Sequence, residues 1–221
     1  MRDYTSLIAL NQKRWKTSVF KPELESTVAA VAGRLVKFKL VYQQVEVDTK
    51  VPWWAIAVIH EREASQRWDR SIAQGDPWNM VSVHEPRKRG PFKSWHDAAI
   101  DALVNCAPFA AKWTDWSAGG ALTLLELYNG TGYESHGIAS PYLWSGSQHY
   151  VSGKFVEDGP HGFRANVVDK QLGCAYILFE MSKLEGGELW LPSRLPEPSP
   201  SPQPSPSPSL LSRLASFVRS R

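Results

Sequence analysis

The sequence has few cysteines and no long apolar run. Its 221 residues include only Cys106 and Cys174, and neither lies in a CxxC motif or a Cys/His cluster. This argues against a disulfide scaffold and a structural zinc site. No segment approaches the roughly 18 consecutive apolar residues of a membrane span. The N-terminus, with Asp3 and a short apolar stretch, differs from a secretory signal, so we expect no export signal.

Several catalytic motifs are also missing. The sequence has no Walker loop, no dinucleotide fingerprint and no G-x-S-x-G elbow. His60 and Glu61 begin like a zinc-protease HExxH helix, but Ala64 stands where the second histidine is required. We therefore expect no metal and no organic cofactor. A net charge of +3 is too small to indicate a nucleic-acid partner.

The composition predicts one folded domain with an appendage. Hydrophobic residues make up 43% of the chain and charged residues 21%, as in ordinary globular proteins. Pro192–Ser209 alternates Pro and Ser, which is typical of a linker. Residues 210–221 combine apolar residues at helical spacing with three arginines, so this cationic tail could contact an anionic membrane or simply aid solubility. We predict a domain over residues 1–191, a linker over 192–209 and a tail over 210–221.

The patterns before the linker predict a mainly α domain. A helix opening at Pro52 should be buried on all sides, because Trp53–Ile59 is almost entirely apolar. Five Gly and Pro residues indicate a long loop over Ser71–Phe92, with a small hairpin. The other expected helices are Glu23–Val47, Ser94–Asn105, Ala121–Tyr128 and Asn166–Leu184.

Two carboxylates, Glu61 and Glu63, lie where the apolar helix should end. Cleavage of a glycosidic bond needs an acid that keeps its proton near neutral pH, and apolar surroundings raise a carboxyl pKa in this way. Helical periodicity places the two residues on opposite faces, each with apolar neighbours, so it does not select between them. Both could equally be solvated charges paired with Arg62 or Arg67.

Four motifs resemble one known family. PWWAIAVIHEREAS, QGDPWNMVSVHEP, ELYNGTGY and SPYLWSGSQHYVSGKFVEDG, spread over Val51–Gly159, look like the lysozyme-family endolysins of phages and prophages. The resemblance implies a lysozyme-like or lytic-transglycosylase-like helical fold. It also implies cleavage of the β-1,4 bond between N-acetylmuramic acid and N-acetylglucosamine in peptidoglycan.

The resemblance assigns the principal acid to Glu63 through a pattern similar to I-H-x-x-E-S. The family serine after that glutamate is Ala64 here, so no role for a hydroxyl carries over. Tyr128 and Asn129 are similar to the A-Y-N motif of lytic transglycosylases, in which the tyrosine can orient the carboxyl group. Without the resemblance, these two residues would simply end a helix capped by Gly130.

Asp76 matches the family's G-D-P-L stretch and is the candidate for a second catalytic carboxylate. An Asp before Pro also commonly opens a turn, and a lytic transglycosylase needs no second carboxylate. The candidate substrate-binding residues offer stacking rings and hydrogen-bonding groups suited to a sugar groove, although the loop from Ser140 onward could instead be a packed support. They are His60, Asn129, Tyr142, Trp144 and Gln148.

The resemblance also implies the partner and the place of action. We expect a monomer that accumulates in the host bacterial cytoplasm and reaches the peptidoglycan through a separate membrane lesion. Two rival hypotheses remain: a non-catalytic wall-binding module that has lost its chemistry, and a wall peptidase or amidase. Analysis of the digestion products separates peptide-bond from glycan cleavage.

Overall fold

The structure is a computed structural model that describes residues 3–156 and 162–187. Within these ranges it contains eight α-helices and one two-stranded antiparallel hairpin, which confirms the mainly α prediction. The predicted linker (192–209) and tail (210–221) lie outside the described residues. The helices and strands are α1 (Thr5–Lys16), α2 (Glu25–Lys37), α3 (Lys39–Thr49), α4 (Trp53–Ala64), α5 (Trp95–Asn105), α6 (Ala118–Asn129), α7 (Pro141–Trp144), β1 (Lys154–Phe155), β2 (Phe163–Arg164) and α8 (Cys174–Leu184).

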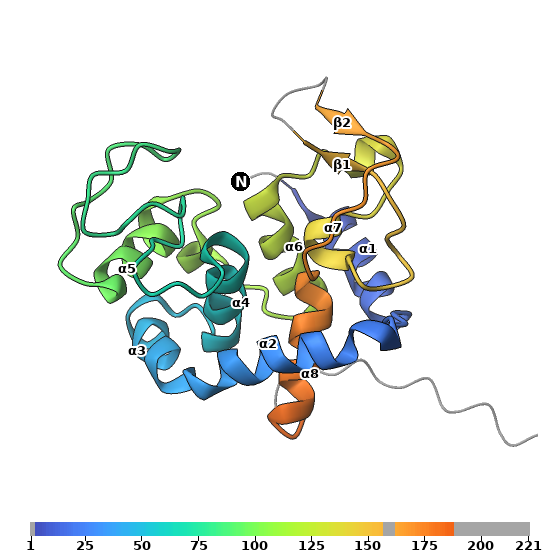
Figure 1. Ribbon diagram of the computed structural model, residues 1–221, viewed down its shortest axis with the longest axis horizontal. Helices are drawn as coiled ribbons and strands as arrows, with labels where there is room; N and C mark the ends of the chain where they lie inside the picture. The colour runs from blue at the N-terminus through green and yellow to red at the C-terminus, as the bar shows by residue number, and fades with distance from the viewer. Residues whose placement is uncertain (1–2, 157–161, 188–221) are drawn as a thin grey trace, which may run out of the picture.

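Helix α4 lies in the middle of the fold (Figure 1) and packs against α2, α3, α6 and α8. Every side chain from Trp53 to His60 is buried, as predicted for a helix that is apolar all round. The helix ends where Ser65 and Gln66 both adopt left-handed backbone conformations, with φ of 51° and 55°. The last turn of α4, which carries Glu63, therefore lies between the buried core and the start of the long loop.

Helix α1, which the sequence patterns did not indicate, docks against α6. Gly119 makes this close approach possible, because a Cβ there would lie 2.5 Å from the carbonyl oxygen of Ile8. The backbone N–H of Gly119 donates to Oε1 of Gln12 at 2.9 Å. Gly119 thus lets the N-terminal helix pack closely against α6.

The single helix predicted from Glu23 to Val47 is wrong. A short 3-10 turn (Pro22–Leu24) precedes α2, and α2 and α3 meet at Phe38, which leaves helical geometry with φ of −101° and ψ of 16°. The Phe38 ring packs against Trp68, with the ring centroids 5.1 Å apart. This contact between distant parts of the chain favours a bend that local helix propensity does not indicate.

The predicted hairpin position and the predicted start of the last helix also need correction. The Ser71–Phe92 segment is a loop, whereas the hairpin pairs Phe155 with Phe163. The last helix begins at Cys174 instead of Asn166. Gly173 lies so close to α7 that a Cβ would be 2.3 Å from the Leu143 carbonyl oxygen. Packing against α7 therefore holds the residues before α8 outside the helix.

Candidate active site

Glu63 lies on the last turn of α4, and its side chain is half-buried. The hydroxyl of Tyr142, on the short helix α7, donates a hydrogen bond of 2.7 Å to Oε1 of Glu63. Pro141 at the first position of α7 suits the start of a helix. The two residues are 79 positions apart in the sequence, so this contact depends on how α4 and α7 pack.

Burial raises the pKa of Glu63 above the usual value for a glutamate, and the Tyr142 hydrogen bond and the charge of Arg62 only partly oppose this effect. The pKa of Tyr142 is also raised, first by burial and then by the negative charge of Glu63. Tyr142 therefore stays a neutral donor. Glu63 has the main property of a general acid, a carboxyl group that holds its proton at higher pH than an exposed glutamate does.

The other glutamate of the same turn, Glu61, is held differently. Its Oε2 accepts a hydrogen bond of 2.8 Å from Nη2 of Arg34 on α2, and the two groups form a salt bridge. Helical periodicity could not separate Glu61 from Glu63, but the tertiary structure does. Glu61 is paired with Arg34 at the contact between α2 and α4, and Glu63 accepts a hydrogen bond from Tyr142 instead.

Tyr128, near the C-terminal end of α6, has its hydroxyl buried with no hydrogen-bond partner among the described residues. Burial raises the pKa of Tyr128, and the charge of Glu63 raises it further, so the two groups lie close enough to interact. Asn129 follows as the exposed last residue of α6. The structure thus joins Glu63 and Tyr142 by a direct hydrogen bond and leaves Tyr128 within electrostatic range of Glu63.

The loop that follows α4 returns to Glu63 at Gly75. With φ of +70°, Gly75 lies so close that a Cβ would be 3.3 Å from the backbone carbonyl oxygen of Glu63. The neighbouring Asp76 is buried, and its carboxylate accepts hydrogen bonds from the backbone N–H groups of Val83 and His84, at 2.8 and 2.9 Å. Nδ1 of His84 lies 2.7 Å from the other oxygen.

Burial alone would raise the pKa of Asp76, but the hydrogen bonds from His84 and Val83 outweigh it and lower the pKa. Both carboxylate oxygens are therefore engaged within the loop. The geometry gives Asp76 a role in holding the loop together, because its carboxylate links residue 76 to residues 83 and 84. A direct catalytic role for Asp76 stays a prediction.

Two predicted substrate-binding residues, His60 and Trp144, are fully buried. His60 has no exposed surface; Nδ1 lies 3.1 Å from the Tyr42 hydroxyl, and Nε2 lies 3.0 Å from the Arg67 carbonyl oxygen. Burial lowers the pKa of His60 to about 4, so it is a neutral core residue. Trp144 is also 0% exposed and belongs to the hydrophobic core. Neither ring can stack on a sugar in this conformation.

Gln148 is exposed and Tyr142 is buried, and both side chains are engaged in hydrogen bonds. The side chain of Gln148 is engaged on both sides, because Oε1 accepts from the Val19 backbone N–H at 2.6 Å and Nε2 donates to the Thr17 carbonyl oxygen at 2.5 Å. Gln148 thus ties the segment after α1 to the segment after α7. Tyr142 is buried, and its position in the site is that of a donor to Glu63, with no open face for a sugar.

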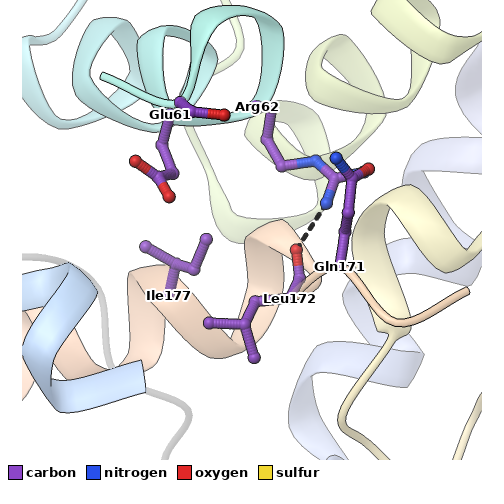
Figure 2. Close-up of a pocket in the computed structure, with 6 residues that line it drawn as sticks. Glu61, Arg62, Gln171, Leu172 and Ile177 are labelled. Atoms are coloured by element: carbon purple, nitrogen blue, oxygen red, sulfur yellow. Dashed lines mark hydrogen bonds between the residues drawn. The ribbon is translucent and has the colours of Figure 1, made fainter. Parts of the chain in front are cut away.

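Arg62 is a site residue that the sequence did not single out. Its guanidinium carbon lies 4.4 Å from the centroid of the Tyr142 ring, and Nη1 donates to the Leu172 carbonyl oxygen at 2.7 Å. Figure 2 shows this hydrogen bond at a small pocket between the end of α4 and the start of α8. The sequence offered no signal for this role, since arginine at a helix end is usually a solvated charge.

Comparisons with protein-family models, curated proteins and solved structures gave no match to this chain. Over the described ranges, no cluster of His, Cys, Asp and Glu could hold a metal ion. Cys106 and Cys174 are buried and unpaired. None of the described helices is long and apolar enough to cross a membrane.

Proposed function

We propose that this chain cleaves the β-1,4 bond between N-acetylmuramic acid and N-acetylglucosamine in peptidoglycan, with Glu63 as the general acid. The observation that carries the proposal is a half-buried carboxyl group with a raised pKa, held by the Tyr142 hydroxyl at 2.7 Å. Such a group can protonate the leaving oxygen of a glycosidic bond near neutral pH. The four endolysin-like motifs support the same substrate, and with it a lysozyme-like fold.

The arrangement favours the reaction that needs one carboxylate. Glu63 gives its proton to the glycosidic oxygen as the bond to C1 of the muramic acid breaks. The C6 hydroxyl of the same sugar then attacks C1 and returns a proton to Glu63, which leaves a 1,6-anhydro end. Asp76 and Glu61 are engaged in other contacts, and neither is among the groups that shift the pKa of Glu63. This supports lytic transglycosylase chemistry over a hydrolase with two carboxylates.

A comparison of two isosteric variants tests the proposal. Glu63→Gln keeps the size and polarity of the side chain but has no proton to transfer, whereas Glu61→Gln changes a carboxylate two residues away on the same helix. Purified peptidoglycan should be cleared by the wild type and by Glu61→Gln, and Glu63→Gln should be slower by at least about a hundredfold. Circular dichroism checks that both variants are folded.

Mass spectrometry of the soluble products then identifies the chemistry. Anhydromuramic ends indicate a lytic transglycosylase, and reducing muramic ends indicate a lysozyme. Released peptides with intact glycan would instead support a peptidase or amidase. If folded Glu63→Gln clears the wall as fast as the wild type, Glu63 is not the acid. A wild type that binds the wall without cleaving it would be a binding module.

A further inference from the structure

A second, larger pocket lies at the C-terminal end of α6. Its volume is about 420 Å³, which falls within the usual range of small-molecule sites. Three segments that are distant in the sequence form its walls: the residue before α1, the segment between α5 and α6, and the end of α6. The lining residues are Tyr4, Ala107, Pro108, Phe109, Lys112, Trp113, Leu127, Gly130 and Thr131.

The C-terminal end of α6 carries both Tyr128 and part of the pocket wall. Leu127 and Gly130, which line the pocket, flank Tyr128 and Asn129 in the sequence. The charge of Glu63 influences Tyr128, as does Cys106, the residue before the 107–113 part of the wall. The shared end of α6 is the route by which a polymer at Glu63 would continue into the pocket.

The apolar part of the pocket wall consists mainly of aromatic rings. The Tyr4 and Trp113 rings lie 6.1 Å apart at a tilt of 48°, and the Trp113 indole N–H donates to the Asp115 carbonyl oxygen at 2.6 Å. This hydrogen bond fixes the indole within the wall. Flat aromatic faces with fixed orientation suit the C–H face of a pyranose ring.

Phe109 is held in the pocket by an unusual backbone conformation. Its φ is +61°, a region that bulky residues rarely adopt, and its side chain is 41% exposed. Its backbone N–H donates to the Cys106 carbonyl oxygen at 2.8 Å, which helps to maintain the turn. An exposed phenylalanine in a strained turn gains little from core burial, so its energetic cost suggests a use in binding.

Lys112 supplies a positive charge at the same place. Its Nζ lies 4.8 Å from the centroid of the Phe109 ring, and it forms no salt bridge with any described residue. The ammonium group is therefore available for a carboxylate on a ligand. In peptidoglycan, the peptide on a muramic acid carries such carboxylates, and a muramic acid without a peptide carries one on its lactyl group.

We propose that the pocket formed by Tyr4, Phe109, Lys112 and Trp113 is a carbohydrate subsite that binds one sugar ring of an N-acetylated glycan carrying carboxylates. The rings stack on the sugar, and Lys112 pairs with the carboxylate. This inference rests on the proposed function, because it takes the glycan strand at Glu63 as the polymer that extends into the pocket.

The test is a binding measurement on the full chain carrying Glu63→Gln, so that the ligand is not consumed. The probes are a tetramer of N-acetylglucosamine and the alternating tetrasaccharide that contains muramic acid, titrated by calorimetry. Phe109→Asn removes the ring while tolerating the left-handed backbone. Lys112→Gln removes only the charge. Leu40→Asn, which alters a 76% exposed apolar side chain on α3, is the matched control.

Phe109→Asn should weaken both tetramers by roughly tenfold. Lys112→Gln should weaken only the muramic acid tetramer, by about threefold to tenfold, and less at high salt. Leu40→Asn should change neither affinity. If the parent binds the tetramers and all three variants bind them equally well, the subsite is wrong while the proposed function stands. If the parent binds neither tetramer, the subsite is overturned, and clearing of peptidoglycan by the wild type then decides the proposed function separately.

Discussion

The guanidinium of Arg62 lies 4.4 Å from the ring centroid of Tyr142, so the residue before Glu63 covers the tyrosine that holds Glu63. Arg62 is itself anchored by its hydrogen bond to the carbonyl oxygen of Leu172, two residues before α8. The side chains of Arg62, Glu63 and Tyr142 form one unit across α4 and α7, which Arg62 ties to the segment before α8. Substitutions of Arg62 or Tyr142 should therefore change the pKa and the reactivity of the Glu63 carboxyl group.

Tyr142→Phe should lower kcat on peptidoglycan by about tenfold, because one hydrogen bond to a charged or reacting carboxyl contributes about 1.5 kcal/mol. The hydroxyl also lowers the pKa of Glu63, so its removal should raise that pKa further. Activity that needs protonated Glu63 is lost as pH rises through the pKa. The alkaline limb of the pH–rate profile should then move to higher pH. A limb that stays in place or moves to lower pH would contradict the role of Tyr142.

Two substitutions at Arg62 separate its charge from its shape. The positive charge of Arg62 lowers the pKa of Glu63, so Arg62→Gln should move the alkaline limb of the pH–rate profile upward. Arg62→Lys keeps the charge and should leave the limb nearly unchanged. Because lysine lacks the planar guanidinium that stacks on Tyr142, it should still lower kcat several-fold. Equal profiles for the two variants would mean that the charge of Arg62 does not act on Glu63.

Asp76→Asn should destabilise the protein by roughly 1–3 kcal/mol, because an amide cannot accept all the hydrogen bonds from Val83 and His84. The pKa of Asp76 is lowered in the folded state, so its stabilisation is present above the unfolded pKa and is lost as pH falls through the folded one. Urea unfolding at several pH values measures both effects. Activity of the folded variant should fall by less than a hundredfold; a larger loss with normal stability would make Asp76 a second catalytic carboxylate.

The buried pair of Asn11 and Glu126 predicts a pH dependence of stability. Nδ2 of Asn11 donates to Oε2 of Glu126 at 3.0 Å, while Oδ1 of Asn11 and Oε1 of Glu126 have no partner among the described residues. We predict that a protonated Glu126 donates from Oε1 to Oδ1 of Asn11 and so completes the pair. Burial raises the pKa of Glu126 to about 7, with Arg14 and Glu134 as the nearby charges.

Because the folded pKa of Glu126 is raised, this contribution is complete below the unfolded pKa and is lost as pH rises through about 7. The free energy of unfolding should fall by about 3 kcal/mol over this pH range. Glu126→Gln, which imitates the protonated acid, should be more stable than the wild type at pH 8 and should remove this part of the pH dependence. Urea unfolding of the wild type, Glu126→Gln and the exposed control Glu23→Gln at several pH values measures this difference in stability. Parallel stability curves for wild type and Glu126→Gln would exclude the protonated pair.

Local patterns predicted several helices well. Ser94 caps α5 by accepting a hydrogen bond from the Asp97 backbone N–H, and the apolar run from Trp53 gives a helix that is buried along its length. These features depend on neighbours within one or two turns. The bend at Phe38 and the late start of α8 depend on Trp68 and Leu143, which lie far away in the sequence, and so escaped prediction.

By itself, the sequence determined that this is a mainly α protein with an apolar central helix ending in two carboxylates, because hydrophobic periodicity and capping are local properties. Only the tertiary structure decided which of the two carboxylates has the raised pKa. Arg34 from α2 neutralises Glu61, while Tyr142 from α7 holds Glu63 in partly buried surroundings. The physical reason is that a pKa depends on burial and on charges in space, and both are fixed by the packing of helices that are distant in the chain.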